Sequence, residues 1–333
     1  MCTAITLRSG QGETFFGRTM DFSYPIEPGL FMNPRNSVWN SGVDQSEISS
    51  TFGFLGVGQE SGGMFAFFDG VNEKGFAAAS LYFAGYAQYD DWQAPSWKKP
   101  VANVDFLRYI LGKCGSVEDL KEIVKKVRIV GLEDPVTGTI APLHWIAADR
   151  NGGCVVIEQT EKGFHIFQNP IGVLANSPDF MWQMTNLRNY MDASPRQTEQ
   201  TDWGEVHLTP FGQGAGTNPL PGSYTSPARF VRTAYQKTHI AGIQSRDEAI
   251  MAGFHIMESV SVSKGAVLTD RGTWDYTRYT AFINLGTCEY FFRSYDNSQI
   301  FTSGLAENCQ SSTKLIYLGN LDQPVKFQKL KEN

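Results

Sequence analysis

Paired strand patterns at the amino terminus constrain the fold most strongly. Residues 2–8 and 14–22 are rich in β-forming residues, and the turn-forming sequence SGQG separates them. Residues 52–58, 64–70 and 75–83 continue this pattern, with GVNEKG as a second strong turn signal. Short strands joined by tight turns predict an antiparallel sheet that begins with the first residues of the chain.

Helical and strand patterns then alternate along the chain. Spacing and capping signals predict four helices, over 104–114, 117–127, 226–240 and about 246–259. Further strands are expected over 143–149, 154–159, 164–169, 172–177, 265–270, 279–285, 288–296 and 299–304. No low-complexity linker divides this order, so we expect one domain over residues 1–333, with helices covering packed sheets.

The segment 181–226 is long, irregular and rich in Gly, Pro, Asn and Gln. Such a stretch within a globular chain is typical of a functional or assembly loop. Ser226 and Pro227 at its end are expected to form the N-cap and first position of the next helix.

Charge and hydropathy exclude several classes of protein. The net charge is −6, and no run of Lys or Arg indicates a nucleic-acid or anionic-membrane partner. No apolar stretch has the length of a membrane span, and the first 20 residues lack the apolar core of a signal peptide. We therefore expect a soluble, cytoplasmic protein.

The cysteines do not indicate a disulfide framework or a zinc site, because they are widely spaced and form no CxxC motif. Five are present: Cys2, Cys114, Cys154, Cys288 and Cys309. Four are expected to fill space in apolar or helical surroundings. The five histidines form no metal-binding motif, and no GxSxG motif is present. The glycines at 211–216 do not follow a strand, so they do not indicate a dinucleotide site.

Cys2 stands out by position alone. If Met1 is removed, Cys2 carries both a thiol and a free α-amine, and the amine can act as the base that activates its own side chain. The predicted hairpin places residue 18 about opposite residue 3 or 4, which brings Arg18 and Asp21 close to Cys2. The alternative is a small apolar residue at a strand start beside an ordinary surface Arg–Asp pair.

Several blocks together resemble the choloylglycine hydrolase family, which contains penicillin V acylases and conjugated bile salt hydrolases. They are MCT at the start, RTMDF, DGVNEKG, GVLANSPDF, LTPFGQGAGTNPLPG and YTSPARFVR, followed by YTRYT and YFFRSYDN. The resemblance implies an αββα N-terminal nucleophile (Ntn) hydrolase fold with two stacked antiparallel sheets. It also implies hydrolysis of linear, non-peptide amides without a metal or organic cofactor. A homotetramer is implied as well, with 185–224 as the assembly loop.

The resemblance also assigns roles to individual residues. Cys2 would be the nucleophile and base, with Arg18 and Asp21 supporting the thiol and the amine. Asn176 would donate a side-chain N–H to the oxyanion, and Arg229 would steady developing negative charge near the nucleophile. The alternatives are a turn asparagine before Ser-Pro and an exposed arginine in the first turn of a helix.

Tyr82 bears on the choice of substrate. In this family the bile salt hydrolases tend to have asparagine at that position, and Gram-positive-type penicillin V acylases tend to have tyrosine and use its backbone N–H. The sequence therefore favours penicillin V acylase activity, although a core aromatic residue on a strand is the alternative. Aromatic candidates for the acyl slot are Phe22, Tyr82, Phe83 and Trp145.

Other functions remain open at this stage. A bile salt hydrolase is the nearest alternative, and an acyl-homoserine lactone acylase would use the same chemistry. A glutamine amidotransferase domain also begins with Met-Cys but usually adjoins a synthase domain, for which this chain has no room. A non-catalytic ligand-binding relative is the last alternative, against which the intact set of site residues argues.

Overall fold

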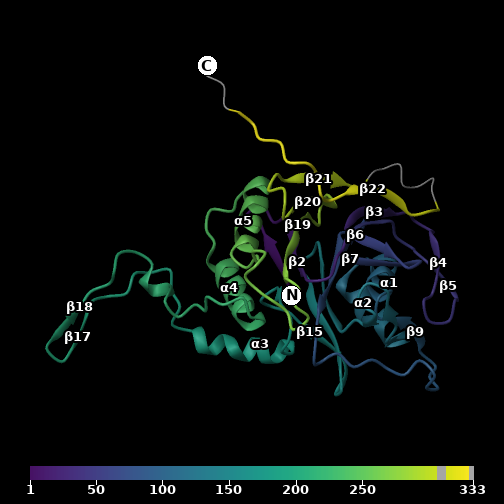
Figure 1. Cartoon of the computed structure of the whole chain (residues 1–333), viewed down its shortest axis with the longest axis horizontal. Helices are drawn as coiled ribbons and strands as arrows, with labels where there is room; N and C mark the ends of the chain where they lie inside the picture. Colours follow the sequence, from purple (N-terminus) through teal and green to yellow (C-terminus); the bar gives the residue numbers. More distant parts are fainter. Residues whose placement is uncertain (306–312, 330–333) are drawn as a thin grey trace.

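Two antiparallel sheets pack face to face in the computed structural model, which describes residues 1–305 and 313–329 (Figure 1). The six-stranded sheet A has the order β16 (Val173–Leu174), β1 (Cys2–Arg8), β2 (Thr14–Phe22), β19 (Tyr276–Asn284), β20 (Glu289–Ser294), β21 (Phe301–Gly304). The eight-stranded sheet B has the order β15 (Gly163–Gln168), β14 (Cys154–Thr160), β13 (Leu143–Asp149), β8 (Phe76–Tyr82), β7 (Met64–Asn72), β6 (Phe54–Ser61), β3 (Gly29–Asn33), β22 (Ile316–Asn320).

Helices cover the outer faces of both sheets. The helices α1 (Phe106–Lys113) and α2 (Val117–Ile123) pack on sheet B, and α4 (Ser226–His239) and α5 (Arg246–Glu258) pack on sheet A (Figure 1). The layers therefore follow the order helix, sheet, sheet, helix, and the expected αββα class is confirmed. Among the described residues, no helix combines the length and apolar character needed to cross a membrane.

Shorter elements complete the chain. They are β4 (Val38–Asn40), β5 (Glu47–Ser49), β9 (Lys99–Ala102), β10 (Val127–Val130), β11 (Glu133–Asp134), β12 (Thr139–Ile140), α3 (Phe180–Asn186), β17 (Thr201–Trp203) and β18 (Val206–Leu208). The hairpin of β17 and β18 projects away from the sheets (Figure 1).

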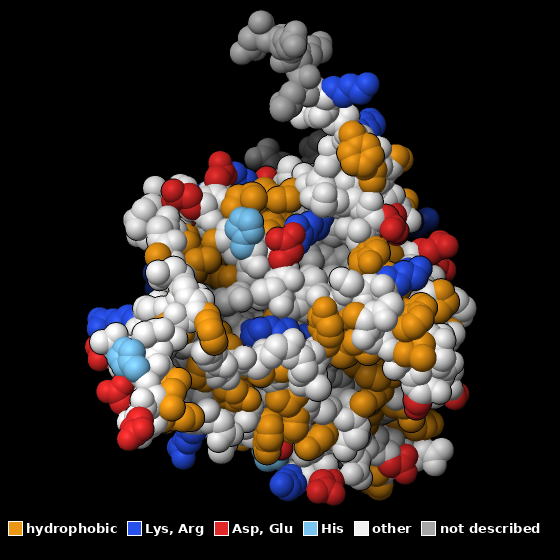
Figure 2. Space-filling model, turned by 60° about the vertical axis from the view of Figure 1, so that its left-hand side comes forward, with side chains coloured by type: hydrophobic (Ala, Val, Ile, Leu, Met, Phe, Trp, Pro, Cys, Tyr) orange, Lys and Arg blue, Asp and Glu red, His pale blue; other side chains and the backbone are white. Residues whose placement is uncertain are grey.

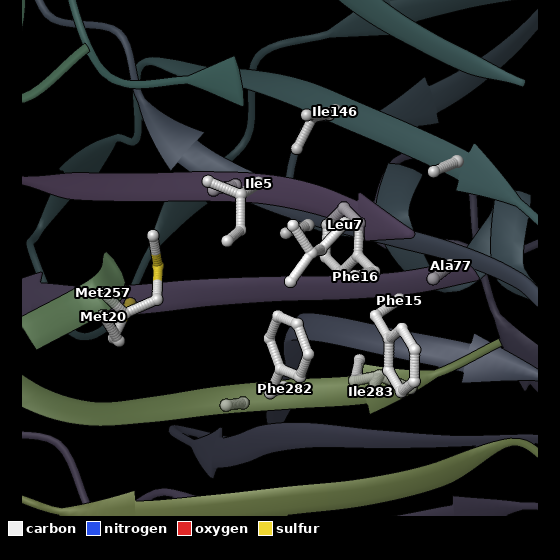
Figure 3. Packing of buried hydrophobic residues seen from close by; sticks show 14 of the residues in the cluster. Ile5, Leu7, Phe15, Phe16, Met20, Ala77, Ile146, Met257, Phe282 and Ile283 are labelled. Atoms are coloured by element: carbon white, nitrogen blue, oxygen red, sulfur yellow. The ribbon is translucent and has the colours of Figure 1, made fainter. Parts of the chain in front are cut away.

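The two strands at the amino terminus form the predicted hairpin. Ala4 lies opposite Arg18, as the turn position required. Because side chains alternate along a strand, one face of β1 and β2 meets sheet B and the other meets α4 and α5. Figure 3 shows residues of β1, β2 and β19 in this packing, together with Met257 of α5 and with Ala77 and Ile146 of sheet B. The register therefore points the Cys2 side chain into the space between the sheets.

Some predicted boundaries were wrong. Residues 265–270 form no strand, because their backbone groups close turns within 263–275 instead of joining sheet A. The strand expected over 172–177 is reduced to β16, and the segment expected to be irregular contains α3. The helix expected to reach residue 127 ends at Ile123 and continues as a short 3₁₀ turn.

The start of α4 also differs from expectation. Ser226 is its first residue rather than its N-cap, which is Thr225. The Ser226 hydroxyl instead accepts a hydrogen bond from the backbone N–H of Asn176. Of the space-filling cysteines, Cys114, Cys154 and Cys288 are buried and unpaired, and Cys309 lies outside the described residues.

Candidate active site

Cys2 begins β1 and is only 3% exposed, with its side chain on the face that meets sheet B. Its sulfur lies 2.9 Å from Nη2 of Arg18. A guanidinium in this position places a positive charge beside the sulfur, where negative charge develops when the sulfur acts as a nucleophile. The predicted proximity of Cys2 and Arg18 is present in the structure.

Arg18 is buried between the two sheets. Its Nη1 donates to the carbonyl of Phe68 at 2.9 Å and to that of Ser80 at 3.2 Å. These carbonyls belong to β7 and β8, so the guanidinium is fixed by the backbone of sheet B. Burial opposes the charge on Arg18, but the surrounding negative groups, Cys2 first among them, raise its pKa above the usual value.

A buried carboxylate lies behind this guanidinium, and sequence reasoning did not identify it. Asp69 Oδ2 lies 3.6 Å from Arg18 Nη1. The hydroxyl of Tyr279 donates to Asp69 Oδ2 at 2.5 Å, and that of Tyr290 donates to Oδ1 at 2.8 Å. Burial raises the pKa of Asp69, and the nearby Arg18 opposes this effect. The sulfur, the guanidinium and the carboxylate therefore form a buried row that crosses from sheet A to sheet B.

Asp21 lies on the opposite face of β2, toward the helices. The hydroxyl of Thr277 donates to its Oδ1 at 2.6 Å, and that of Thr19 donates to Oδ2 at 3.2 Å. Burial raises the pKa of Asp21, and Arg229 opposes this effect most strongly. The carboxylate is therefore held by donors on both oxygens.

The amino terminus lies beside the same strand. The Met1 amine donates to the backbone carbonyl of Asp21 at 2.7 Å and to Asp275 Oδ2 at 3.0 Å. The Cys2 N–H donates to Asn176 Oδ1 at 2.8 Å. Removing Met1 would convert this peptide nitrogen into an α-amine that is already in contact with a side-chain acceptor.

Asn176 is held at each of its polar atoms. Its Oδ1 accepts from Cys2 N–H and from Arg229 Nη2, the latter at 2.6 Å. Its Nδ2 donates to the carbonyl of Tyr82 at 2.7 Å. An amide nitrogen carries two hydrogens, so one N–H of Asn176 is not engaged by this bond.

Arg229 comes from the first turns of α4 and is fully buried rather than exposed. Its Nη1 donates to the Cys2 carbonyl and to Thr3 Oγ1, each at 2.5 Å, and lies 3.8 Å from Asp21 Oδ2. Burial lowers the pKa of Arg229, and the charge of Asp21 opposes this effect. Arg229 thus joins the backbone of Cys2 to Asn176 and Asp21.

Tyr82 ends β8 and offers a backbone donor. Phe83 N–H donates to Pro142 O at 2.7 Å on the β13 side, so the preceding N–H, that of Tyr82, points the other way. Pairing with β7 reaches only to Ala79, so Tyr82 lies beyond it. The Tyr82 ring packs edge-on against Phe22, with ring centroids 6.1 Å apart.

A largely apolar pocket opens at Cys2. The main apolar side chains lining it are Met20, Phe22, Ile26, Met64, Phe67, Phe68, Tyr82, Leu107, Val136, Leu143 and Trp145. Polar groups are contributed by Gln59, Ser61, Ser80, Asn103, Asp134 and Thr137. Of the four aromatic candidates, only Phe83 does not line this pocket; it stacks on His144 instead.

The structure thus brings all six predicted site residues together. Sequence reasoning gave no role to four residues that are remote from Cys2 in the chain: Asp69, Thr277, Tyr279 and Tyr290. One signal was available: Asp69 opens the block DGVNEKG, and Thr277 and Tyr279 lie in YTRYT.

Comparison with known proteins gives consistent results. The family model described as linear amide C–N hydrolases, choloylglycine hydrolase family, matches residues 2–317. The bile salt hydrolase/transferase of Clostridium perfringens is 33% identical over 302 residues, which cover 90% of this chain and 91% of that protein. The penicillin V acylase of Pectobacterium atrosepticum is 27% identical over 305 residues, which cover 85% of this chain and 75% of that protein.

A solved structure is similar over nearly the whole chain. The mutant C2A conjugated bile acid hydrolase from Clostridium perfringens superposes with a TM-score of 0.91 at 30% identity, covering 99% of this chain and all (100%) of that chain.

Proposed function

Because this chain belongs to the choloylglycine hydrolase family of linear amide C–N hydrolases, we propose that it hydrolyses the amide bond of conjugated bile acids with Cys2 as nucleophile. The observation that carries this proposal is the apolar pocket that opens directly at the Cys2 sulfur. An apolar lining with a few polar groups suits a steroid acid, whose glycine or taurine amide would then lie over the sulfur.

The proposed first step requires removal of Met1. The freed α-amine of Cys2 accepts the thiol proton as the sulfur attacks the amide carbon. Arg18, 2.9 Å from the sulfur, stabilises the negative charge that develops on the sulfur as this proton leaves. Asn176 Oδ1 and the Asp21 carbonyl, which are hydrogen-bond acceptors near the amino terminus, would orient the α-amine.

The tetrahedral intermediate places negative charge on the former carbonyl oxygen. The second Nδ2–H of Asn176 and the backbone N–H of Tyr82 are the donors we assign to it. Each well-placed donor of this kind contributes about 3–4 kcal/mol in comparable sites. The C–N bond then breaks, and the nitrogen of the leaving glycine or taurine takes the proton from the Cys2 α-ammonium. Water attacks the resulting thioester, with the α-amine again as base, and releases the carboxylic acid.

Penicillin V acylase activity is the second candidate, and Tyr82 favours it. A flat aromatic ring beside Phe22 suits a phenoxyacetyl group, as the sequence suggested. The comparisons favour bile acid hydrolysis, because this chain is 33% identical to the bile salt hydrolase and 27% identical to the penicillin V acylase. We therefore rank the two activities in the reverse of the order that Tyr82 alone suggested.

Parallel turnover assays test this ranking. Glycocholate, taurocholate and penicillin V would be compared at equal concentrations, and we expect the largest kcat/KM with a bile acid conjugate. Turnover of penicillin V without turnover of either conjugate would reverse the ranking.

The nucleophile is tested by Cys2→Ala. We expect activity to fall to background while the fold is retained, because no other group supplies the sulfur. The matched control is Cys114→Ala, a buried cysteine on the outer side of sheet B. Full activity of Cys2→Ala would refute the mechanism. Intact mass of the purified wild type should show loss of Met1 in the active fraction.

We also propose that the chain assembles as a homotetramer through residues 185–224. The hairpin of β17 and β18 projects from the sheets (Figure 1), and its Trp203 is 75% exposed. The view in Figure 2, with the left-hand side of Figure 1 brought forward, shows further hydrophobic side chains spread over this face. Large apolar side chains exposed on a projecting segment are typical of an interface with a second copy.

A further inference from the structure

A buried histidine and glutamate lie beside the segment that carries Asn176. His144 of β13 and Glu158 of β14 are 0% and 1% exposed. His144 Nδ1 is 3.2 Å from Glu158 Oε1, and its Nε2 is 3.0 Å from the carbonyl oxygen of Ala175. The mechanism proposed above uses neither side chain.

Both partners of the His144 ring are hydrogen-bond acceptors. A neutral imidazole has one N–H and one lone pair, so it can donate to only one of them. The other nitrogen would then direct its lone pair at an oxygen. Both contacts become favourable only if the ring carries two N–H groups, or if Glu158 itself carries a proton. Either state holds one proton more than a neutral histidine beside an ionised glutamate.

Burial supports the same conclusion. Glu158 also accepts the backbone N–H of Phe180, at 3.0 Å to Oε1 and 3.3 Å to Oε2. A single backbone donor does not compensate a buried carboxylate, which costs several kcal/mol when it is left unpaired. The additional proton makes the His144–Glu158 pair neutral as a whole.

The two side chains hold the backbone on both sides of Asn176. His144 binds the carbonyl of Ala175, the residue before it, and Glu158 binds the N–H of Phe180, four residues after it. We propose that His144 and Glu158 share one proton and that this protonated pair positions Asn176 for the oxyanion. The inference rests on the proposed role of Asn176, and it makes His144 and Glu158 positioning residues rather than catalytic ones.

Other titratable groups face this pair from neighbouring elements. His165 of β15 lies opposite Glu158 in the strand register. A surface groove that reaches Glu158 is also lined by Glu161, Lys162 and Asp179. On the other side, Phe83 stacks on the His144 ring with centroids 4.2 Å apart, and Tyr86 stacks on Phe83. The groove gives the pair a route for proton exchange with solvent.

Glu158→Gln is the informative variant. Its amide would donate permanently to His144 Nδ1 and still accept the Phe180 N–H, so both backbone contacts survive without the shared proton. In a wild-type pair without that proton, only one of the two contacts can form. We expect the ratio of kcat at pH 9 to kcat at pH 7 to be at least about threefold larger in the variant. Superimposable pH profiles would overturn the proposal.

Substitutions of His144 separate positioning from packing. Asparagine cannot reach the Ala175 carbonyl, whereas glutamine places an N–H near the position of Nε2. We expect His144→Asn to lower kcat about tenfold with little change in KM, because the oxyanion contact acts in the transition state. His144→Gln should restore most of kcat. Equal loss in both variants would point to packing alone. The matched control is His165→Gln on β15, which β14 separates from the strand of His144.

Hydrogen exchange gives a readout that does not depend on activity. In His144→Asn, we expect the amides of residues 175–180 to exchange at least about threefold faster than in wild type. If wild type turns over neither glycocholate nor penicillin V, the proposed function fails, and the exchange result still tests the pair. Unchanged exchange in His144→Asn would overturn the pair proposal even in an active enzyme.

Discussion

At the scale of single residues, the arginine beside the nucleophile is as informative as the nucleophile itself. Arg18 lies between the Cys2 sulfur and the Asp69 carboxylate, and it is almost fully buried. A buried guanidinium is tolerated only when charge and hydrogen bonds compensate it. We infer that Asp69 keeps Arg18 in place when the sulfur is consumed as a thioester and no longer carries charge.

Asp69→Asn tests this support. The change removes the negative charge with little change in volume, so Arg18 loses its permanent counter-ion. Breaking a buried pair in this way costs about 3–5 kcal/mol. We expect a lower free energy of unfolding in urea and a kcat reduced about tenfold.

The matched control is Tyr290→Phe. It removes one hydrogen bond to Asp69 and leaves the charges intact, so we expect a loss of about 1 kcal/mol in stability and nearly normal kcat. An Asp69→Asn variant with wild-type stability and kcat would show that Arg18 does not depend on this carboxylate.

Sequence reasoning was limited by how far apart the site residues lie along the chain. Cys2 and Arg18 lie on one face of one hairpin, so a turn position and a two-residue period were enough to bring them together, whereas the Asp21 side chain lies on the other face. Asp69 and Tyr279 lie on different sheets, and their contact depends on how the sheets stack. No local pattern specifies that stacking, although family order had placed residues as distant as Asn176 and Arg229 in the same site.

At the scale of elements, α4 connects the site to the rest of sheet A. Arg229 and Lys237 are eight residues apart and so lie on one face of the helix. Lys237 Nζ donates to Ile171 O at 2.6 Å and to Thr6 Oγ1 at 3.0 Å. The helix therefore contacts the first residues of β1 through Arg229, and it contacts Thr6, nearer the end of β1, through Lys237.

Lys237 gives α4 a testable pH dependence. Burial lowers its pKa to about 8, and the nearby Cys154 opposes this effect. Above pH 8 the unfolded chain binds more protons at this residue than the folded one does. The contribution of Lys237 to stability therefore rises with pH between about 8 and 10.5, and its burial penalty is fully present below pH 8.

Urea unfolding of wild type and Lys237→Met at pH 7.5 and 9.5 measures this contribution. The difference in free energy of unfolding, wild type minus variant, should increase by about 1–2 kcal/mol at the higher pH. The exposed Lys125→Met is the control and should show no such change. A difference that is constant or decreases with pH would contradict the assignment.

The packing of α5 on sheet A requires a glycine. A Cβ at Gly253 would lie 2.4 Å from two ring atoms of Phe282. Replacing a helical glycine by alanine usually gains about 1 kcal/mol, but overpacking of a core costs about 1–3 kcal/mol. Because the ring is buried against sheet A, we expect Gly253→Ala to be destabilising.

Thermal unfolding tests whether Gly253→Ala is destabilising. The control is Gly222→Ala, where the added Cβ meets no atom within 4 Å. The melting temperature should fall for Gly253→Ala and stay within about 1–2 °C of wild type for Gly222→Ala. A more stable Gly253→Ala protein would mean that Phe282 can move away without cost.

Element types were more predictable than element ends. Strong alternation and capping signals located most strands of the two large sheets and the helices that cover them. The prediction failed for segments whose structure depends on distant partners. Residues 265–270 have strand-like composition but form turns with nearby residues. The strand β22 was not predicted, and it forms by pairing with β3 at the edge of sheet B.

At the scale of the whole molecule, the segment 185–224 is the feature that the two-sheet architecture does not explain. Its hairpin makes no part of either large sheet. Met191, Trp203 and Phe211 on this segment are largely exposed. An isolated two-stranded hairpin is marginally stable in water, so contacts with other copies of the chain would give it support.

Light scattering with gel filtration tests assembly through this segment. A homotetramer of the 37.0 kDa chain would have about four times that mass. Replacing Trp203 and Phe211 together by serine should shift the mass toward smaller species, because it removes the apolar contacts that an interface needs. The control is Met251→Ser, which alters an exposed hydrophobic residue on α5 and should leave the mass unchanged. A monomeric wild type would refute the assembly proposal, whereas an intact tetramer of the double variant would place the interface on another surface.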